Sequence, residues 1–185
     1  MKAHDDRQPR HRFPDMRIKE TFIILIVALL FIVAGGLWLA PDLLNPKAPD
    51  IGLTTIKGDK IQLKDLEGKP VLVTFWATSC PGCLKEQPHL VELYNKLHPQ
   101  GLEIIGIAMS YDPPNQVIAL QKNRDLPYTI ALDLDGSAAQ SFDDVRLTPT
   151  SFLISPEGKI VFKKIGEMDM AKIEQTIHDM LKQKG

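Results

Sequence analysis

Hydrophobic residues are distributed along the chain in three different patterns. Residues 21–40, TFIILIVALLFIVAGGLWLA, form one uninterrupted apolar stretch without a charged residue. Near-continuous apolar runs at residues 71–76 and 102–108 are typical of strands that are buried on both faces of a sheet. Residues 81–97 and 171–182 instead repeat their apolar side chains at helical spacing. The chain therefore predicts one long apolar helix, followed by a domain in which strands and helices alternate.

Turn signals between shorter segments predict the rest of this domain. The sequences KGD at residues 57–59 and SPEG at residues 155–158 each separate two short strands, as hairpin turns do. Two strand–helix units, a hairpin and a closing helix predict an α/β domain with a mixed central sheet flanked by helices. The shorter elements that we expect are strands at residues 53–56, 60–63, 129–132, 151–154 and 159–165, and helices at residues 113–123 and 137–142.

The apolar stretch has the dimensions of a membrane anchor. Twenty helical residues span about 30 Å, which is the thickness of the hydrocarbon core of a bilayer. The first basic residue after the stretch is Lys47, whereas a basic cluster precedes it. This imbalance predicts that residues 1–20 are a cytoplasmic tail and that the rest of the chain lies in the periplasm, beyond the bacterial inner membrane. The basic cluster consists of Arg7, Arg10, Arg12, Arg17 and Lys19.

A cleaved signal peptide is the alternative, although the apolar region is longer than the usual one of about 7–15 residues. Residues 41–50 contain three prolines and are expected to be a linker, so that the folded domain covers residues 51–185. The chain has 22 basic and 23 acidic residues. This balance argues against nucleic acid as a partner, because a binder of polyanions carries a clear excess of basic residues.

The two cysteines of the chain, Cys80 and Cys83, lie where the buried strand 71–76 gives way to the helix 81–97. A bridge across two residues closes too short a loop to stabilise a fold. At the first turn of a helix, however, free N–H groups and the helix dipole favour a thiolate. We expect Cys80 to be accessible and Cys83 to lie one turn further in. The pair is therefore predicted to be redox-active.

Other uses of a Cys-x-x-Cys pair fit the sequence less well. A zinc site needs a second cysteine pair or paired histidines, which this chain lacks, and we expect no metal and no cofactor. A thiol peroxidase of the peroxiredoxin type has threonine three residues before its reactive cysteine, where this chain has Ala77. A copper-binding assembly module would have Cys-x-x-x-Cys and a distant histidine. The peroxidase and the copper module stay open as alternatives.

Four segments carry a more specific pattern: APD at residues 48–50, LEGKP at 66–70, FWATSCPGC at 75–83, and TPTSFLI at 148–154 followed by PEGK. Together they resemble the membrane-anchored thioredoxin-like oxidoreductases of the TlpA/ResA type, related to the thioredoxins of cytochrome c maturation. The resemblance implies a thioredoxin-like fold with an added N-terminal hairpin and a central insertion. It also implies that Cys80 attacks the client and that Cys83 resolves the mixed disulfide.

The resemblance assigns further residues to client binding. Pro149 matches the cis-proline that faces the active site, and the backbone of Thr148 before it is expected to pair with the client chain. The remaining residues in this group surround the cysteines: Trp76, Ser79 and Pro81. Ser79 stands where the family commonly has tryptophan. The family pattern therefore does not determine the client preference or the redox potential of this chain.

Glu86 lies three residues after Cys83, on the apolar stripe that Leu90 and Leu93 continue. A carboxylate on this stripe is costly unless it is protonated or has a partner. A glutamate at the rim, open to solvent or paired with a lysine, is the alternative. Members of the family often carry an acid here, and the expected role of Glu86 is proton exchange with Cys83.

As a whole, the resemblance implies a protein-disulfide reductase. Its expected partners are a client protein with a disulfide, from cytochrome c maturation or copper-site assembly, and a membrane thiol-electron donor. The inner membrane is the third partner, through residues 21–40. The sequence identifies neither the client nor the donor.

Overall fold

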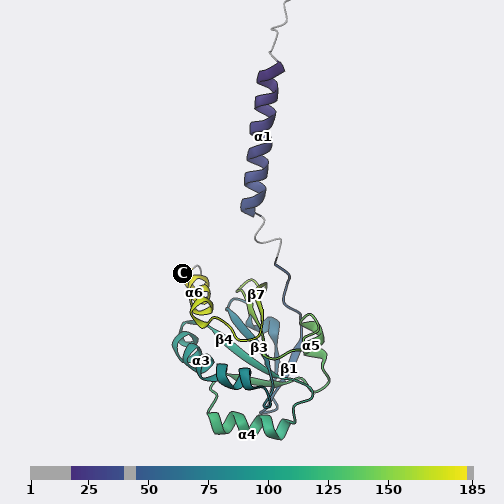
Figure 1. Ribbon diagram of the computed structural model, residues 1–185, viewed down its shortest axis with the longest axis vertical. Helices are drawn as coiled ribbons and strands as arrows, with labels where there is room; N and C mark the ends of the chain where they lie inside the picture. The colour runs from purple at the N-terminus through teal and green to yellow at the C-terminus, as the bar shows by residue number, and fades with distance from the viewer. Residues whose placement is uncertain (1–17, 40–44, 183–185) are drawn as a thin grey trace, which may run out of the picture. The chain divides into compact units, whose positions relative to one another are not determined.

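The computed structural model of the chain describes residues 18–39 and 45–182 (Figure 1). The chain divides into two compact units, Met1–Leu44 and Asn45–Gly185. The second unit contains the whole domain that the sequence predicts at residues 51–185.

The described part of the first unit is a single helix, α1 (Ile18–Leu39). It confirms that residues 21–39 of the apolar stretch are helical. Among the described residues, none of the helices is both long and apolar enough for a membrane crossing. Residues 1–17 of the expected tail lie outside the described part of the chain.

The second unit contains the alternating strands and helices that the sequence predicts, with bounds that differ by a few residues at most. Two elements were not expected, a short 3-10 helix before the first buried strand and another directly after the helix at residues 81–97. In chain order the elements are β1 (Gly52–Thr55), β2 (Lys60–Gln62), η1 (Leu63–Leu66), β3 (Val71–Trp76), α3 (Pro81–Leu97), η2 (His98–Gln100), β4 (Glu103–Ala108), α4 (Pro114–Arg124), β5 (Thr129–Leu132), α5 (Ser137–Ser141), β6 (Thr150–Ile154), β7 (Ile160–Ile165) and α6 (Met170–Lys182).

The strands form one mixed sheet in the order β2-β1-β5-β4-β3-β6-β7. The three central strands β3, β4 and β5 run parallel, and β6 pairs antiparallel with β3 and β7. β5, which comes between α4 and β6 in the chain, extends the sheet beyond β4, and α5 follows it and packs on one face. The N-terminal hairpin β1–β2 then adds to β5 in antiparallel pairing. The added hairpin and β5, the strand of the central insertion, therefore extend the sheet at the same edge.

Helices cover both faces of the sheet, because each central strand is apolar on both sides (Figure 1). Leu72 and Trp76 of β3 face one core, which also contains Leu90 and Leu93 of α3 and Ile173 of α6. The alternate residues of β3 face the opposite core, which α5 and η1 cover. There Phe75 packs edge to face against Phe142 and Phe152, at centroid distances of 5.4 and 6.1 Å.

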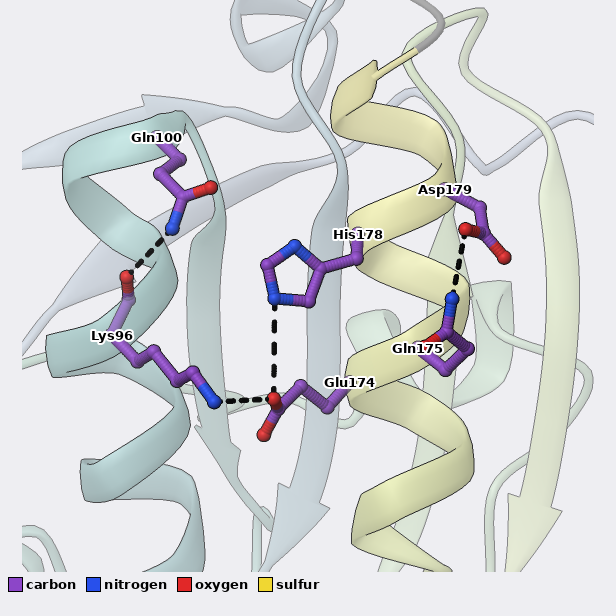
Figure 2. Close-up of polar contacts among 6 residues, drawn as sticks. All are labelled: Lys96, Gln100, Glu174, Gln175, His178 and Asp179. Carbon is purple, nitrogen blue, oxygen red and sulfur yellow. Dashed lines mark hydrogen bonds and ion pairs between the residues drawn. The ribbon is translucent and has the colours of Figure 1, made fainter.

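α3 and α6 pack on the same face of the sheet, and the ion pair between Lys96 and Glu174 joins them at their surface (Figure 2). Lys96 Nζ lies 2.6 Å from Glu174 Oε1, and His178 Nε2 lies 3.9 Å from the same oxygen. Exposed pairs of this kind contribute about 1 kcal/mol or less. The apolar contacts beneath them, with Ile173 and Ile177 fully buried, hold α6 in place.

The second half of the expected linker at residues 41–50 belongs to the domain. The Ala48 N–H donates to the Gly158 carbonyl, and the Ile160 N–H donates to the Pro46 carbonyl, both at 2.8 Å. Residues 40–44 lie outside the described part of the chain.

Candidate redox site

The two cysteines form a disulfide at the point where β3 gives way to α3. Cys80 is the N-cap residue of α3, and its sulfur accepts a hydrogen bond from the Cys83 N–H at 3.2 Å. Pro81 occupies the first turn, where its missing N–H leaves no helix bond unmade. The bridge spans 5.3 Å between Cα atoms and one helical turn. Sulfur and free backbone N–H groups therefore meet at the positive end of the helix.

Both cysteines are buried in the disulfide form. The accessible fraction is 8% for Cys80 and 3% for Cys83. The order agrees with the prediction that Cys80 is the outer residue and that Cys83 lies further in. The neighbouring residues Ser79 and Pro81 are exposed on either side of it.

The loop before Cys80 is held by an aspartate that the sequence analysis did not single out. Asp112 is 6% exposed, and its two oxygens accept the N–H and the hydroxyl hydrogen of Thr78, each at 2.6 Å. Asp112 follows β4, the parallel neighbour of β3, so both loops leave the sheet at the same edge. That shared edge is the signal from which this contact could have been predicted.

Pro149 lies against the first turn of α3. The Thr148–Pro149 peptide bond is cis, as the resemblance implied. A Cβ atom added to Gly82 would lie 3.5 Å from Pro149 Cδ, so the proline ring is in contact range of the helix between the two cysteines. Thr148 is half-buried, whereas Leu147 before it is 62% exposed. The structure thus brings Thr148 and Pro149 together with the disulfide.

Glu86 is buried below the cysteines, with 4% of its surface exposed. Its Oε1 accepts a hydrogen bond from the Met168 N–H at 2.7 Å. Burial raises the pKa of Glu86, and the Met168 hydrogen bond opposes this effect only in part. The alternative of a rim glutamate is therefore wrong. The nearby cation Lys85 binds Glu167 instead, at 2.8 Å.

The sequence matches a protein family and several named relatives. Residues 44–163 match the AhpC/TSA family. The thiol-disulfide oxidoreductase ResA of Bacillus cereus is 40% identical over 134 residues, which cover 71% of this chain and 75% of the relative. ResA of Bacillus subtilis is 32% identical over 161 residues, 86% of this chain and 87% of the relative.

The chain belongs to the ResA-type thiol–disulfide oxidoreductases of the AhpC/TSA family. Its activity is thus the exchange of a dithiol and a disulfide. Solved structures agree with the fold. The thioredoxin domain of a thiol-disulfide oxidoreductase from Bacteroides vulgatus is 28% identical with a TM-score of 0.64, over 72% of this chain and 96% of that one. StoA from Bacillus subtilis is 25% identical with a TM-score of 0.60, over 69% and 96%.

The thioredoxin-like fold of this oxidoreductase places Trp76 differently from our expectation. We assigned Trp76 to client binding, but it is only 3% exposed and belongs to the core under α3. It is the last residue of β3 and faces α3 from the sheet, so its indole lies beneath the disulfide and not at the surface. Within the described residues, no group of three or more His, Cys, Asp or Glu side chains could hold a metal ion.

Proposed function

We propose that this oxidoreductase is anchored in the inner membrane by residues 21–40 and reduces a disulfide of a specific client protein in the periplasm. The observation that carries the proposal is the Cys80–Cys83 disulfide at the N-terminus of α3, with Pro149 packed against the first turn of the helix and Glu86 buried below the cysteines. We expect Cys80, the less buried of the two, to react with the client and Cys83 to exchange its proton with the buried acid.

The proposed exchange begins with the reduced dithiol. The Cys80 thiolate attacks one sulfur of the client disulfide; the client S–S bond breaks, and its second sulfur leaves as a thiolate that takes up a proton. Cys83 then transfers its proton to Glu86 and attacks the Cys80 sulfur. The mixed disulfide breaks, the first client sulfur leaves and is protonated, and the Cys80–Cys83 bridge forms. Two electrons and two protons reach the client.

The client is expected to lie across the exposed rim of the site. Thr148 is half-buried beside the proline, and its backbone is the proposed pairing partner of an extended client segment. Leu147 and Ser79 are exposed and would flank such a segment. A serine at position 79 offers less apolar contact area than the tryptophan that the family commonly has, so Leu147 becomes the larger apolar contact at this rim.

The proposed location rests on the sequence around α1. Apolar side chains are exposed along the described part of this helix, from Phe22 at 60% to Val33 at 50%. Basic residues precede residues 21–40 and are missing directly after them, which supports a cytoplasmic N-terminus. A reductase in an oxidising compartment must be reduced again after each turnover, and a membrane thiol-electron donor is the partner that we propose for this step.

A reduction potential tests the proposed direction. The full-length chain in detergent, equilibrated with glutathione or dithiothreitol buffers, should give a potential well below the value of about −120 mV that is typical of a strong periplasmic oxidant. The reduced chain should also reduce a Cys-x-x-Cys-His disulfide peptide, the form of a haem-attachment site before haem is added. A potential near −120 mV, with rapid oxidation of the dithiol peptide, would reverse the direction.

A second experiment tests the location. A reporter enzyme that folds only in the periplasm, fused after Gly185, should be active in cells. The same reporter fused after Glu20 should be inactive, because residues 1–20 are expected to stay in the cytoplasm. Activity only from a cytoplasmic reporter fused after Gly185 would place the redox domain in the cytoplasm.

A further inference from the structure

A small cavity lies directly beneath the disulfide. Its volume is about 10 Å³, and its lining includes Cys83, Glu86, Gln87, Trp76 and Tyr128. A space of this size holds about one water molecule, provided that the lining offers polar partners. The cavity thus lies between the inner sulfur and the buried acid.

Two lining residues have polar atoms without a partner. Among the described residues, Trp76 Nε1 and Gln87 Oε1 are fully buried and make no hydrogen bond. The only other such atom is Ser155 Oγ, which follows β6 at the opposite end of the sheet. A buried polar group without a partner destabilises the fold. Both residues line the same cavity, so one occupant of that cavity can serve as the partner of both.

The two groups complement each other chemically. The indole N–H can only donate a hydrogen bond, and the amide oxygen of Gln87 can only accept one. A water molecule between them accepts the first bond and donates the second, and it keeps one proton and one lone pair for further contacts. Glu86 and Cys83 line the same cavity and are the groups that remain for those contacts.

The surrounding sequence leaves room for this arrangement. Gly106 on β4 lies beside the indole, and a Cβ atom there would come within 3.1 Å of Trp76 Nε1. Gln87 is only 3% exposed, on the inner side of α3. An apolar residue of the same length would fill this place without a polar cost, so packing alone does not explain a glutamine.

We propose that Trp76 Nε1 and Gln87 Oε1 hold one buried water against Cys83 and Glu86, and that Gln87 is thereby a positioning residue for proton transfer. The inference rests on the proposed role of Glu86. As Cys83 resolves the mixed disulfide, its proton passes to the water, and the water passes one of its own protons to the Glu86 carboxylate. The water is unchanged, and the Cys83 thiolate attacks the Cys80 sulfur.

Other titratable groups face Glu86 and affect its titration. Glu167 lies on the loop before α6 and raises the pKa of Glu86, whereas His89 on α3 lowers it. Tyr128, which lies before β5, is buried, and burial keeps its pKa above that of a free tyrosine. Gln87 does not titrate, so its replacement leaves this set of charges intact.

Nuclear magnetic resonance tests the water directly. In the full-length chain in detergent micelles, the indole N–H signal of Trp76 is assigned by its loss in Trp76→Phe, which leaves Trp38. A cross-relaxation peak between this indole proton and water is expected in the parent. It should vanish in Gln87→Met and persist in Gln100→Met, whose exposed glutamine lies in η2 and donates to the Lys96 carbonyl of α3 (Figure 2). A parent without the peak, or a peak that survives in Gln87→Met, overturns the water site.

The kinetics of mixed-disulfide resolution test the role of Gln87 in proton transfer. With the mixed disulfide to a peptide prepared in advance, resolution at neutral pH should be about tenfold slower in Gln87→Met and in Trp76→Phe, and unchanged in Gln100→Met. Unfolding midpoints show that each variant is folded, and Trp76→Phe provides a second test if Gln87→Met is not. Unchanged resolution together with the lost water peak overturns the positioning role. An unaffected Glu86→Gln variant refutes the proposed acid instead, because the water peak does not depend on it.

Discussion

Met168 donates its backbone N–H to the Glu86 carboxylate at 2.7 Å, across 82 residues of the chain. The contact joins the redox helix α3 to the loop between β7 and α6. Lys85 and Glu167 make a second link between the same two segments at the surface. The buried acid therefore has a fixed position below Cys83, but burial still raises its pKa, although the Met168 hydrogen bond and His89 both act to lower it.

Glu86→Gln should stabilise the fold at neutral pH. Burial raises the pKa of Glu86 in the folded state above the value of about 4.3 that it has in an unfolded chain. The stability that comes from the protonated form is therefore complete below about pH 4.3 and is lost as the pH rises through the folded pKa. The variant keeps an oxygen for Met168 and avoids this loss. Above the folded pKa it should gain about 1.4 kcal/mol for each unit of the shift.

Urea unfolding of both oxidised proteins between pH 4 and pH 8 measures this difference. The two stability curves should meet at the acidic end and separate towards neutral pH. Glu157→Gln is the matched control, because Glu157 is exposed in the turn between β6 and β7, at the opposite end of the sheet from Glu86. A constant difference between Glu86→Gln and the parent at all pH values would contradict the raised pKa.

The roles of the two sulfurs predict opposite results for their serine variants. Cys83→Ser should accumulate a mixed disulfide with an oxidised client, because Cys80 attacks and no resolving thiol follows. Cys80→Ser should not, since Cys83 is 3% exposed behind the outer sulfur. Non-reducing gels after mixing each variant with the client show the adduct. Trapping by Cys80→Ser alone would exchange the two roles.

Asp112→Ala should loosen the loop that carries Cys80. Both hydrogen bonds from Thr78 are lost, and an unpartnered backbone N–H remains, at a cost of about 1–3 kcal/mol. The midpoint of urea unfolding should fall, and the reduced Cys80 should react faster with an alkylating reagent. Asp135→Ala is the control, because its exposed carboxylate binds only the neighbouring Ser137. Equal effects of the two variants would mean that Asp112 does not hold the loop.

Long periodic segments could be predicted from the sequence with good bounds. α3 covers Pro81–Leu97 as expected, because helical apolar spacing, a proline in the first turn and a glycine after the end all agree. The mixed sheet followed from apolar strands separated by helices. η1 (Leu63–Leu66) was not predicted, since four residues are too few to show a period.

The candidate site was predictable where its chemistry lies in one segment. Cys80, Cys83 and Glu86 belong to one strand–helix junction, and Glu86 was expected to be buried because it interrupts an apolar stripe. Contacts with residues from distant segments, such as Asp112, were not predicted, because they depend on which strands are neighbours in the sheet. The buried position of Trp76 depends on the face of β3 on which its last residue falls, and the motif alone did not show it.

Gly106 and Gly82 differ in the space around them, so replacing each of them with alanine should change the stability of the fold differently. Gly106→Ala puts a Cβ atom 3.0 Å from Ile130 Cδ1 and 3.1 Å from Trp76 Nε1, inside a packed core. Overpacking of this kind costs about 1–3 kcal/mol. Gly82→Ala instead has its nearest atom at 3.5 Å, an ordinary contact, and replaces a helical glycine, so it should be neutral or stabilising by up to about 1 kcal/mol. Urea unfolding of the oxidised full-length variants compares them. A Gly106→Ala variant as stable as the parent would show that the indole can shift, and that its place beside β4 is not fixed by packing.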